Sequence, residues 1–118
     1  MKVGIRRVYE PPQTGEGLRI LVDRLWPRGV RKEALEYDLW EKDIAPTPEL
    51  RKWFGHAPER WETFHEKYRK ELEAPDVQER LKEIVKTAGK RKITLLYGAR
   101  DPDHNHALIL ADAIERLY

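Results

Sequence analysis

The stretch from Ile93 to Ala107 constrains the fold of this chain more than any other. Its first five residues, Ile93–Tyr97, form an apolar run that ends at Gly98, and such a run is typical of a strand buried on both faces of a parallel sheet. Asp101 and Pro102 then predict a helix N-cap followed by a first-turn proline. The polar loop between strand and helix lies where open α/β folds hold ligands, because free N–H groups and the helix dipole both favour an anion there.

Two further strands are predicted near the N-terminus. Leu18–Val22 contains three consecutive apolar residues, which indicates burial on both faces. The stretch from Val3 to Tyr9 is polar on one side and is expected near a sheet edge. The link Glu10–Gly17 is shorter than the roughly dozen residues of a usual parallel crossover, so we expect a hairpin, with an irregular parallel link as the alternative.

Helical signals dominate the middle of the chain. Thr47 followed by Pro48 predicts the start of a short helix that ends at Gly55, Pro58 opens a second helix, and a third runs from Pro75 to Gly89. Residues 30–45 fit either a helix or a strand. The positions expected on the buried faces of these helices and of the last one are Leu50, Trp53, Phe54, Trp61, Phe64, His65, Tyr68, Leu72, Val77, Leu81, Ile84, Val85, Ala88, Ala107, Leu110, Ala111, Ile114 and Leu117.

A helical excursion that joins two buried strands is an enlarged right-handed crossover, which places the carboxyl ends of both strands on the same edge of the sheet. The predicted fold class is therefore α/β: a single compact domain over residues 1–118, with a small, mainly parallel or mixed sheet flanked by helices in a Rossmann-like layering. The residues expected to face one another across a crevice at this edge are Asp23, Arg24 and Arg28 on one side and Tyr97, Arg100 and His106 on the other.

The amino-acid composition excludes several kinds of catalytic and metal-binding site. The 118 residues include no cysteine and no serine, which excludes disulfides, thiolate metal sites, cysteine nucleophiles and serine acyl transfer. Lys plus Arg total 23 against 21 for Asp plus Glu, and a formal charge of +2 is small for a nucleic-acid binder.

The charged N-terminus and the lack of any apolar run near the roughly 18 residues of a membrane span lead us to expect a cytoplasmic protein with no membrane contact. Heavy use of Glu, Lys and Arg indicates a thermophilic source.

Three ordered blocks of sequence resemble one known family. Val22–Gly29, Leu50–His56 and Leu95–Asp101 with His104–Ala107 are similar to the YeaO-like proteins, small prokaryotic proteins of the domain-of-unknown-function family 488, and the resemblance covers nearly the whole chain. It implies a compact α/β fold but no established reaction, substrate or cofactor. Relatives in the wider family can carry cysteine around the last loop, where this chain has Gly98, Ala99 and Asn105, so thiol chemistry does not carry over. The signature positions that the resemblance marks are Asp23, Arg24, Trp26, Arg28, His56, Arg100, Asn105 and His106.

These residues predict a pocket for a small anionic molecule, bearing phosphate or carboxylate, around residues 97–106. Gly98 lets a ligand approach the backbone, and Arg28 and Arg100 suit bidentate contacts with an anion. If the protein is an enzyme, which the residues leave open, His106 or Asp23 would act as acid or base. The candidate ligand-binding residues are Arg24, Arg28, Tyr97, Arg100 and Asn105.

A purely structural role for the same loop stays open. Asp101 or Asn105 would then cap the last helix, and Arg100 would pair with Asp23 or Asp103. No metal site is expected, because histidines two residues apart on a helix point roughly 200° apart. No cofactor is expected either.

Two other functions remain alternatives. One is a non-catalytic nucleic-acid- or protein-binding module whose basic surface comes from Arg6 with Arg7 and from the run Lys90–Lys92, although the small net charge disfavours nucleic acid. The other is a homodimer with Trp26 or Trp40 at its interface. The aromatic residues of the helices fit a core better than a stacking platform for bases.

Overall fold

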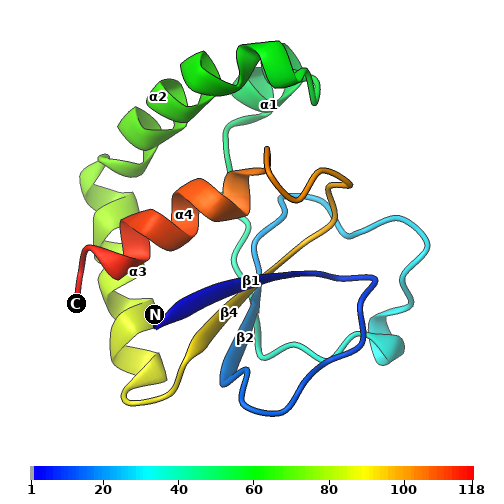
Figure 1. The fold of residues 1–118 in the computed structure, drawn as a ribbon. Helices are drawn as coiled ribbons and strands as arrows, with labels where there is room; N and C mark the ends of the chain where they lie inside the picture. Colours follow the sequence, from blue (N-terminus) through cyan, green and yellow to red (C-terminus); the bar gives the residue numbers. More distant parts are fainter. Residues whose placement is uncertain (1) are drawn as a thin grey trace.

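Strand β4 (Ile93–Tyr97) lies at the centre of the sheet in the computed structural model, which describes residues 2–118. β1 (Val3–Arg7) pairs with one side of β4 and β2 (Leu18–Leu21) with the other, and the two-residue strand β3 (Leu39–Trp40) extends the sheet beyond β2. The order is β1-β4-β2-β3, and every pairing is parallel (Figure 1). The predicted α/β class, the burial of β2 and β4 and the edge position of β1 are confirmed.

The predicted hairpin between β1 and β2 is wrong, and the chain forms the irregular parallel link instead. Glu16 stabilises this link, because its carboxylate accepts hydrogen bonds from the side chains of Arg6 on β1 and Arg19 on β2. Its carbonyl oxygen also accepts a hydrogen bond from the Thr94 hydroxyl of β4 at 2.7 Å. Burial raises the pKa of the Glu16 carboxyl, but the Gln13 N–H and the two arginines outweigh burial and hold this pKa below its usual 4.5. A buried charged cluster thus joins three strands.

The described residues form α1 (Pro48–Phe54), α2 (Trp61–Leu72), α3 (Pro75–Ala88) and α4 (His106–Glu115), with single 3₁₀ turns η1 (Lys32–Ala34) and η2 (Pro58–Arg60). As predicted, Thr47 caps α1 by accepting from the Leu50 N–H, and Gly55 ends it with φ of 53°. None of the helices within residues 2–118 is long and apolar enough to cross a membrane.

The start of α4 differs from the predicted cap at Asp101, and the alternative cap at Asn105 is confirmed. Asn105 rather than Asp101 is the N-cap, and its Oδ1 accepts from the Leu108 N–H at 3.3 Å. The Asp101 carboxylate instead accepts from the Asp103 N–H at 2.9 Å and closes a tight turn before the helix. Because the Asp101 side chain is used in this turn, the helix begins only at His106.

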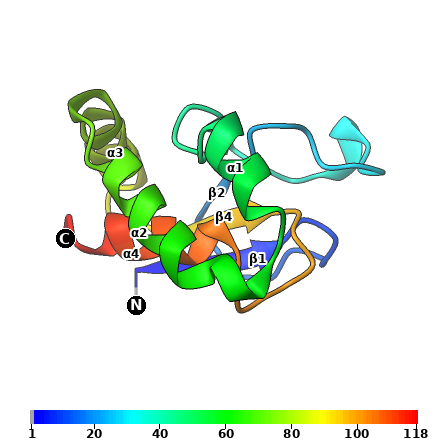
Figure 2. The same cartoon turned by 90° about the horizontal axis from the view of Figure 1, so that it is seen from above.

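One face of the sheet carries the main core. Successive strand residues point to opposite faces, and on this face Ile20 and Leu95 belong to one cluster with Phe64, Leu81 and Leu110 of the helices. Figures 1 and 2 show α1, α2 and α3 forming an arc, with α4 inside it against the sheet. The helical face is therefore closed by two layers of helix.

The opposite face is covered by the segment between β2 and β3. Leu21 and Leu96 form a second cluster there with Leu35, against which Trp26 and Trp40 pack. The two indole rings meet edge to face with centroids 5.3 Å apart. Residues 30–45, which fit either helix or strand by sequence, are an irregular chain that holds only η1 and β3.

The prediction that Trp53 is buried is wrong. Its side chain is exposed on α1, and the Arg60 guanidinium and Lys67 ammonium lie 5.4 Å and 4.9 Å from its ring centroid. Leu50 and Phe54 lie one turn apart and form the buried face of this seven-residue helix, so Trp53 points away from the core.

Candidate functional site

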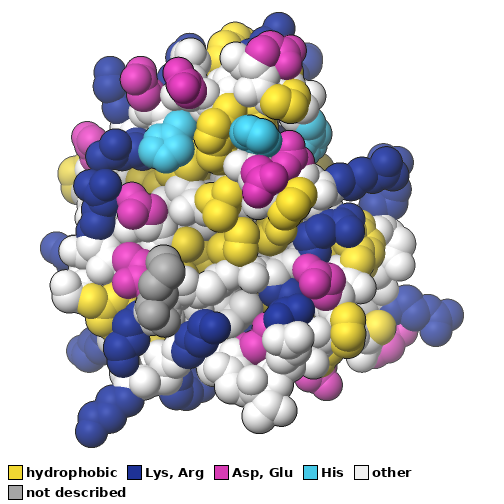
Figure 3. All heavy atoms as spheres, in the orientation of Figure 1, with side chains coloured by type: hydrophobic (Ala, Val, Ile, Leu, Met, Phe, Trp, Pro, Cys, Tyr) yellow, Lys and Arg dark blue, Asp and Glu magenta, His cyan; other side chains and the backbone are white. Residues whose placement is uncertain are grey.

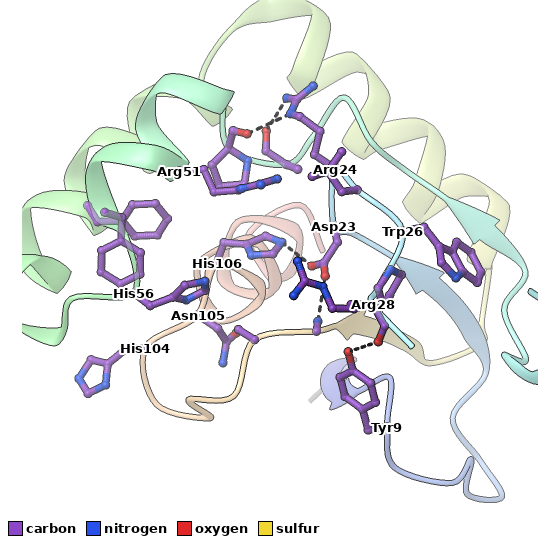
Figure 4. Close-up of a pocket in the computed structure, with 18 residues that line it drawn as sticks. Tyr9, Asp23, Arg24, Trp26, Arg28, Arg51, His56, His104, Asn105 and His106 are labelled. Carbon is purple, nitrogen blue, oxygen red and sulfur yellow. Dashed lines mark hydrogen bonds and ion pairs between the residues drawn. The ribbon is translucent and has the colours of Figure 1, made fainter. Parts of the chain in front are cut away.

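A cavity of about 380 Å³ lies at the carboxyl ends of β2 and β4, beside the first turn of α4 and the last turn of α1 (Figure 4). The loops that follow β2 and β4 meet here because the two strands are parallel, as the predicted crossover requires. The apolar side chains of its wall include Leu25, Pro27, Pro46, Phe54 and Phe64. The cavity therefore combines an apolar wall with the polar loops of two strands, which is typical of small-molecule sites.

Asp23 and His106 lie side by side in the cavity wall. His106 Nε2 is 2.9 Å from the Val22 carbonyl oxygen and 3.5 Å from Asp23 Oδ1. The other oxygen of the Asp23 carboxylate accepts from the Gly98 N–H at 2.9 Å, while the Asp23 carbonyl accepts from the Trp40 indole at 2.8 Å. Because a carbonyl oxygen only accepts, His106 Nε2 carries a hydrogen, and the neutral ring keeps its lone pair on Nδ1.

Burial moves the pKa values of this pair in opposite directions. It lowers the pKa of His106 from its usual 6.5, although the charge of Asp23 and the hydrogen bond to Val22 act the other way. Burial also raises the pKa of Asp23 from 3.8, against the effects of His106 and of the Gly98 N–H. Both shifts favour the uncharged forms, which is the expected result of desolvation.

Three arginines line the cavity and are held differently. Arg24 donates from Nε to the Pro46 carbonyl and from Nη2 to the Ala45 carbonyl, both at 3.2 Å, so its guanidinium is fixed to the chain ahead of α1. Arg28 and Arg51 are exposed residues, and Figure 4 shows their side chains extending toward the centre of the cavity. These two arginines are the ones placed to contact a bound molecule.

His56 reaches the cavity because of the turn that ends α1. Gly55 and His56 both have positive φ, 53° and 57°, and a histidine in this left-handed region is uncommon. The turn brings the His56 imidazole beside Phe54, with ring centroids 6.3 Å apart, and into the cavity wall. Its φ value adds local strain at the site, which tertiary contacts must offset.

The structure places several predicted site residues on the cavity wall: Asp23, Arg24, Arg28, Asn105 and His106. Tyr97 and Arg100 lie outside this lining, which differs from the predicted crevice. Tyr97 shares the face of Leu95 and is buried in the main core, whereas Arg100 is exposed on the loop after β4. Sequence reasoning missed Arg51 as a candidate, although it lies within a block that carries the family resemblance.

The turn before α4 is held by its own side chains. Asn105 Nδ2 donates to the Asp101 carbonyl at 2.9 Å, and His104 Nδ1 lies 2.8 Å from Asp101 Oδ2. Hydrogen bonds from Asp103 and His104 lower the pKa of the Asp101 carboxyl. The His104 ring also meets Trp61 edge to face.

Across residues 2–118, no group of three or more His, Asp or Glu side chains is placed to hold a metal ion.

The surface view shows how charge is spread around this region. In Figure 3, the histidine side chains lie toward the top of the face beside acidic and hydrophobic side chains, while basic side chains are scattered over the whole face. Two residues of the predicted basic surface make internal contacts: Arg6 bonds Glu16, and Arg7 donates to the Ala99 carbonyl at 2.8 Å. This leaves Lys90–Lys92 as its exposed part.

Fold and site together define a small parallel α/β protein with a cationic cavity at the carboxyl edge of its sheet. A family model described as the inactive DUF488-N3 subclade matches residues 2–118, and the chain belongs to this family. It is 45% identical to the uncharacterized protein YeaO of Escherichia coli K12, over 99% of this chain and 100% of that protein. It is 38% identical to the uncharacterized proteins Rv3073c of Mycobacterium tuberculosis and Mb3100c of Mycobacterium bovis, over 96% of this chain and 93% of theirs. No solved structure matches the chain significantly.

Proposed function

We propose that the cavity reversibly binds a small organic anion that carries a phosphate or carboxylate group. The observation that carries the proposal is the charge of the wall. Arg28 and Arg51 extend toward the centre, whereas Asp23 is the only carboxylate among the described lining residues and is already bonded to the Gly98 N–H. Guanidinium groups suit carboxylate and phosphate geometry, and the apolar wall favours a ligand with an apolar portion.

Binding without turnover is the form of this proposal that the chain supports best. The matching family model is described as an inactive subclade, and the chain has neither serine nor cysteine to act as a nucleophile. His106 Nε2 donates its hydrogen to the Val22 carbonyl, so this nitrogen is used in a structural hydrogen bond and not in proton transfer to a substrate. His106 and Asp23 then act as the polar floor of a binding site.

The test is an amide NMR titration with inorganic phosphate and with phenyl phosphate. We expect saturable shifts in the segments 23–29, 51–56 and 98–106, and tighter binding of phenyl phosphate because its ring contacts the apolar wall. Arg28→Ala and Arg51→Ala should each weaken binding by about tenfold, which corresponds to roughly 1.4 kcal/mol for a lost charge-assisted contact.

Lys82→Ala is the matched control, because Lys82 is exposed on α3 and lies outside the cavity lining. It should leave the affinity unchanged. Diffuse shifts that do not saturate, or equal affinities for Arg28→Ala and Lys82→Ala, would contradict the proposed anion site.

A further inference from the structure

A second hollow adjoins the cavity. Its volume is about 440 Å³, and its lining residues are Arg24, Leu25, Pro48, Arg51, Lys52 and His56. Four of these, Arg24, Leu25, Arg51 and His56, also line the cavity. The two spaces therefore lie side by side and share part of their lining.

The charges of the two spaces differ. Every charged side chain that lines the hollow is a cation, Arg24, Arg51 or Lys52, and His56 adds an imidazole. The cavity carries the Asp23 carboxylate as well as its arginines. Because cations that share a hollow repel one another, an anionic group seated there relieves more repulsion than a neutral group.

Two residues allow the cavity and the hollow to be tested one at a time by mutation. Arg28 lines only the cavity, and Lys52 lines only the hollow, while Arg51 and His56 lie on the wall that both share. Figure 4 shows Arg51 and His56 on the α1 side of the cavity. Leu25, which is 61% exposed, also belongs to both linings and offers an apolar contact where they meet.

We infer that the ligand carries two anionic groups joined by a short apolar spacer, an inference that rests on the proposed anion site. One group lies in the cavity near Arg28. The spacer passes Leu25, and the second group lies in the hollow, within reach of Lys52 and Arg51. Bisphosphates and related dianions are the chemical class that this arrangement fits, because joining two weak contacts makes the second one intramolecular.

The experiment compares alkyl monophosphates with α,ω-alkane bisphosphates of three to six carbons, by calorimetry at about 0.15 M salt, where surface charges are largely screened. One spacer length should bind best, about tenfold or more tighter than the monophosphate of the same length. Lys52→Gln should bring the affinity for this bisphosphate to within about twofold of the monophosphate and leave monophosphate binding unchanged. Arg28→Ala should weaken both ligands.

Lys82→Gln again serves as the control for net charge. The inference is overturned if the bisphosphates bind no tighter than the monophosphates, or if Lys52→Gln and Lys82→Gln cause equal losses. In both cases the monophosphates still bind, so the proposed anion site stands. If no phosphate ester binds at all, the proposed function and this inference both fail.

Discussion

His106 is the residue whose local environment has the most measurable consequences. Its ring is enclosed between Asp23, the Val22 carbonyl and Tyr68, whose ring centroid lies 6.2 Å away. Burial lowers its pKa more than Asp23 raises it. The folded protein therefore holds this imidazole neutral with the hydrogen on Nε2, a state that no local sequence pattern specifies.

We expect His106 to titrate below 6.5 in the folded protein, with the Nε2-protonated tautomer at neutral pH. Side-chain nitrogen NMR across pH 5 to 8 measures both properties. Asp23→Asn should lower the pKa of His106 further, because it removes the nearby negative charge that favours the imidazolium. A midpoint at or above 6.5, or a higher pKa in Asp23→Asn, would contradict the described environment.

The same shift predicts a direction for stability. Between the folded pKa and the unfolded value of about 6.5, the unfolded chain binds more protons at this position than the folded protein does. The contribution of His106 to the free energy of unfolding therefore falls as the pH drops below about 6.5. His106→Gln should flatten this pH dependence of the melting temperature, whereas His65→Gln, outside the cavity, should leave it in place.

At the scale of elements, the short link between β1 and β2 depends on one close backbone approach. Gly17 has φ of +69°, and a Cβ there would overlap the Lys92 carbonyl, which accepts the Leu18 N–H at 2.8 Å. Gly15 has φ of +86° but nothing within 4 Å of a Cβ. Alanine at Gly15 would meet only the free-energy cost of a left-handed backbone, whereas alanine at Gly17 would also meet a steric overlap.

Gly17→Ala should lower the free energy of unfolding by about 2 kcal/mol more than Gly15→Ala does. Gly15→Ala carries only the roughly 1 kcal/mol cost of a left-handed backbone, while Gly17→Ala also forces β2 away from β4. Urea denaturation of both variants measures the difference. Equal losses would show that the approach of Gly17 to Lys92 does not determine the register.

At the scale of the whole molecule, two apolar clusters share the same strands. Leu95 belongs to the main core under the helices, and its neighbour Leu96 belongs to the cluster under the segment between β2 and β3. Neither cluster can open without disturbing β4, which pairs on both sides. We therefore expect the helical layer and the opposite face to unfold together.

The variant Trp53→Phe/Trp61→Phe tests this expectation, because Trp26 and Trp40 are then the remaining indoles and both pack on the second cluster. Its urea transitions followed by fluorescence and by far-ultraviolet circular dichroism should coincide. A fluorescence transition at lower urea would mean that the segment between β2 and β3 leaves the sheet independently of the helices.

The elements whose signals are local could be predicted from the amino-acid sequence alone. Thr47 and Gly55 bound α1, Pro75 opens α3, and the continuous apolar runs specify β2 and β4 as buried strands. These signals work because a cap, a left-handed glycine or a buried face involves only neighbouring residues. The same runs were enough to place the carboxyl ends of β2 and β4 together.

The strand order, the start of α4 and the choice of side chains that face the cavity depend on contacts between distant parts of the chain. The insertion of β4 between β1 and β2 overruled the hairpin that the short link suggested. Gly98 and Asp23 are 75 residues apart, and His106 and Val22 are 84 apart. Arg100 has a loop position as favourable as that of Arg28 yet lies outside the cavity, because contacts between distant segments set where each side chain points.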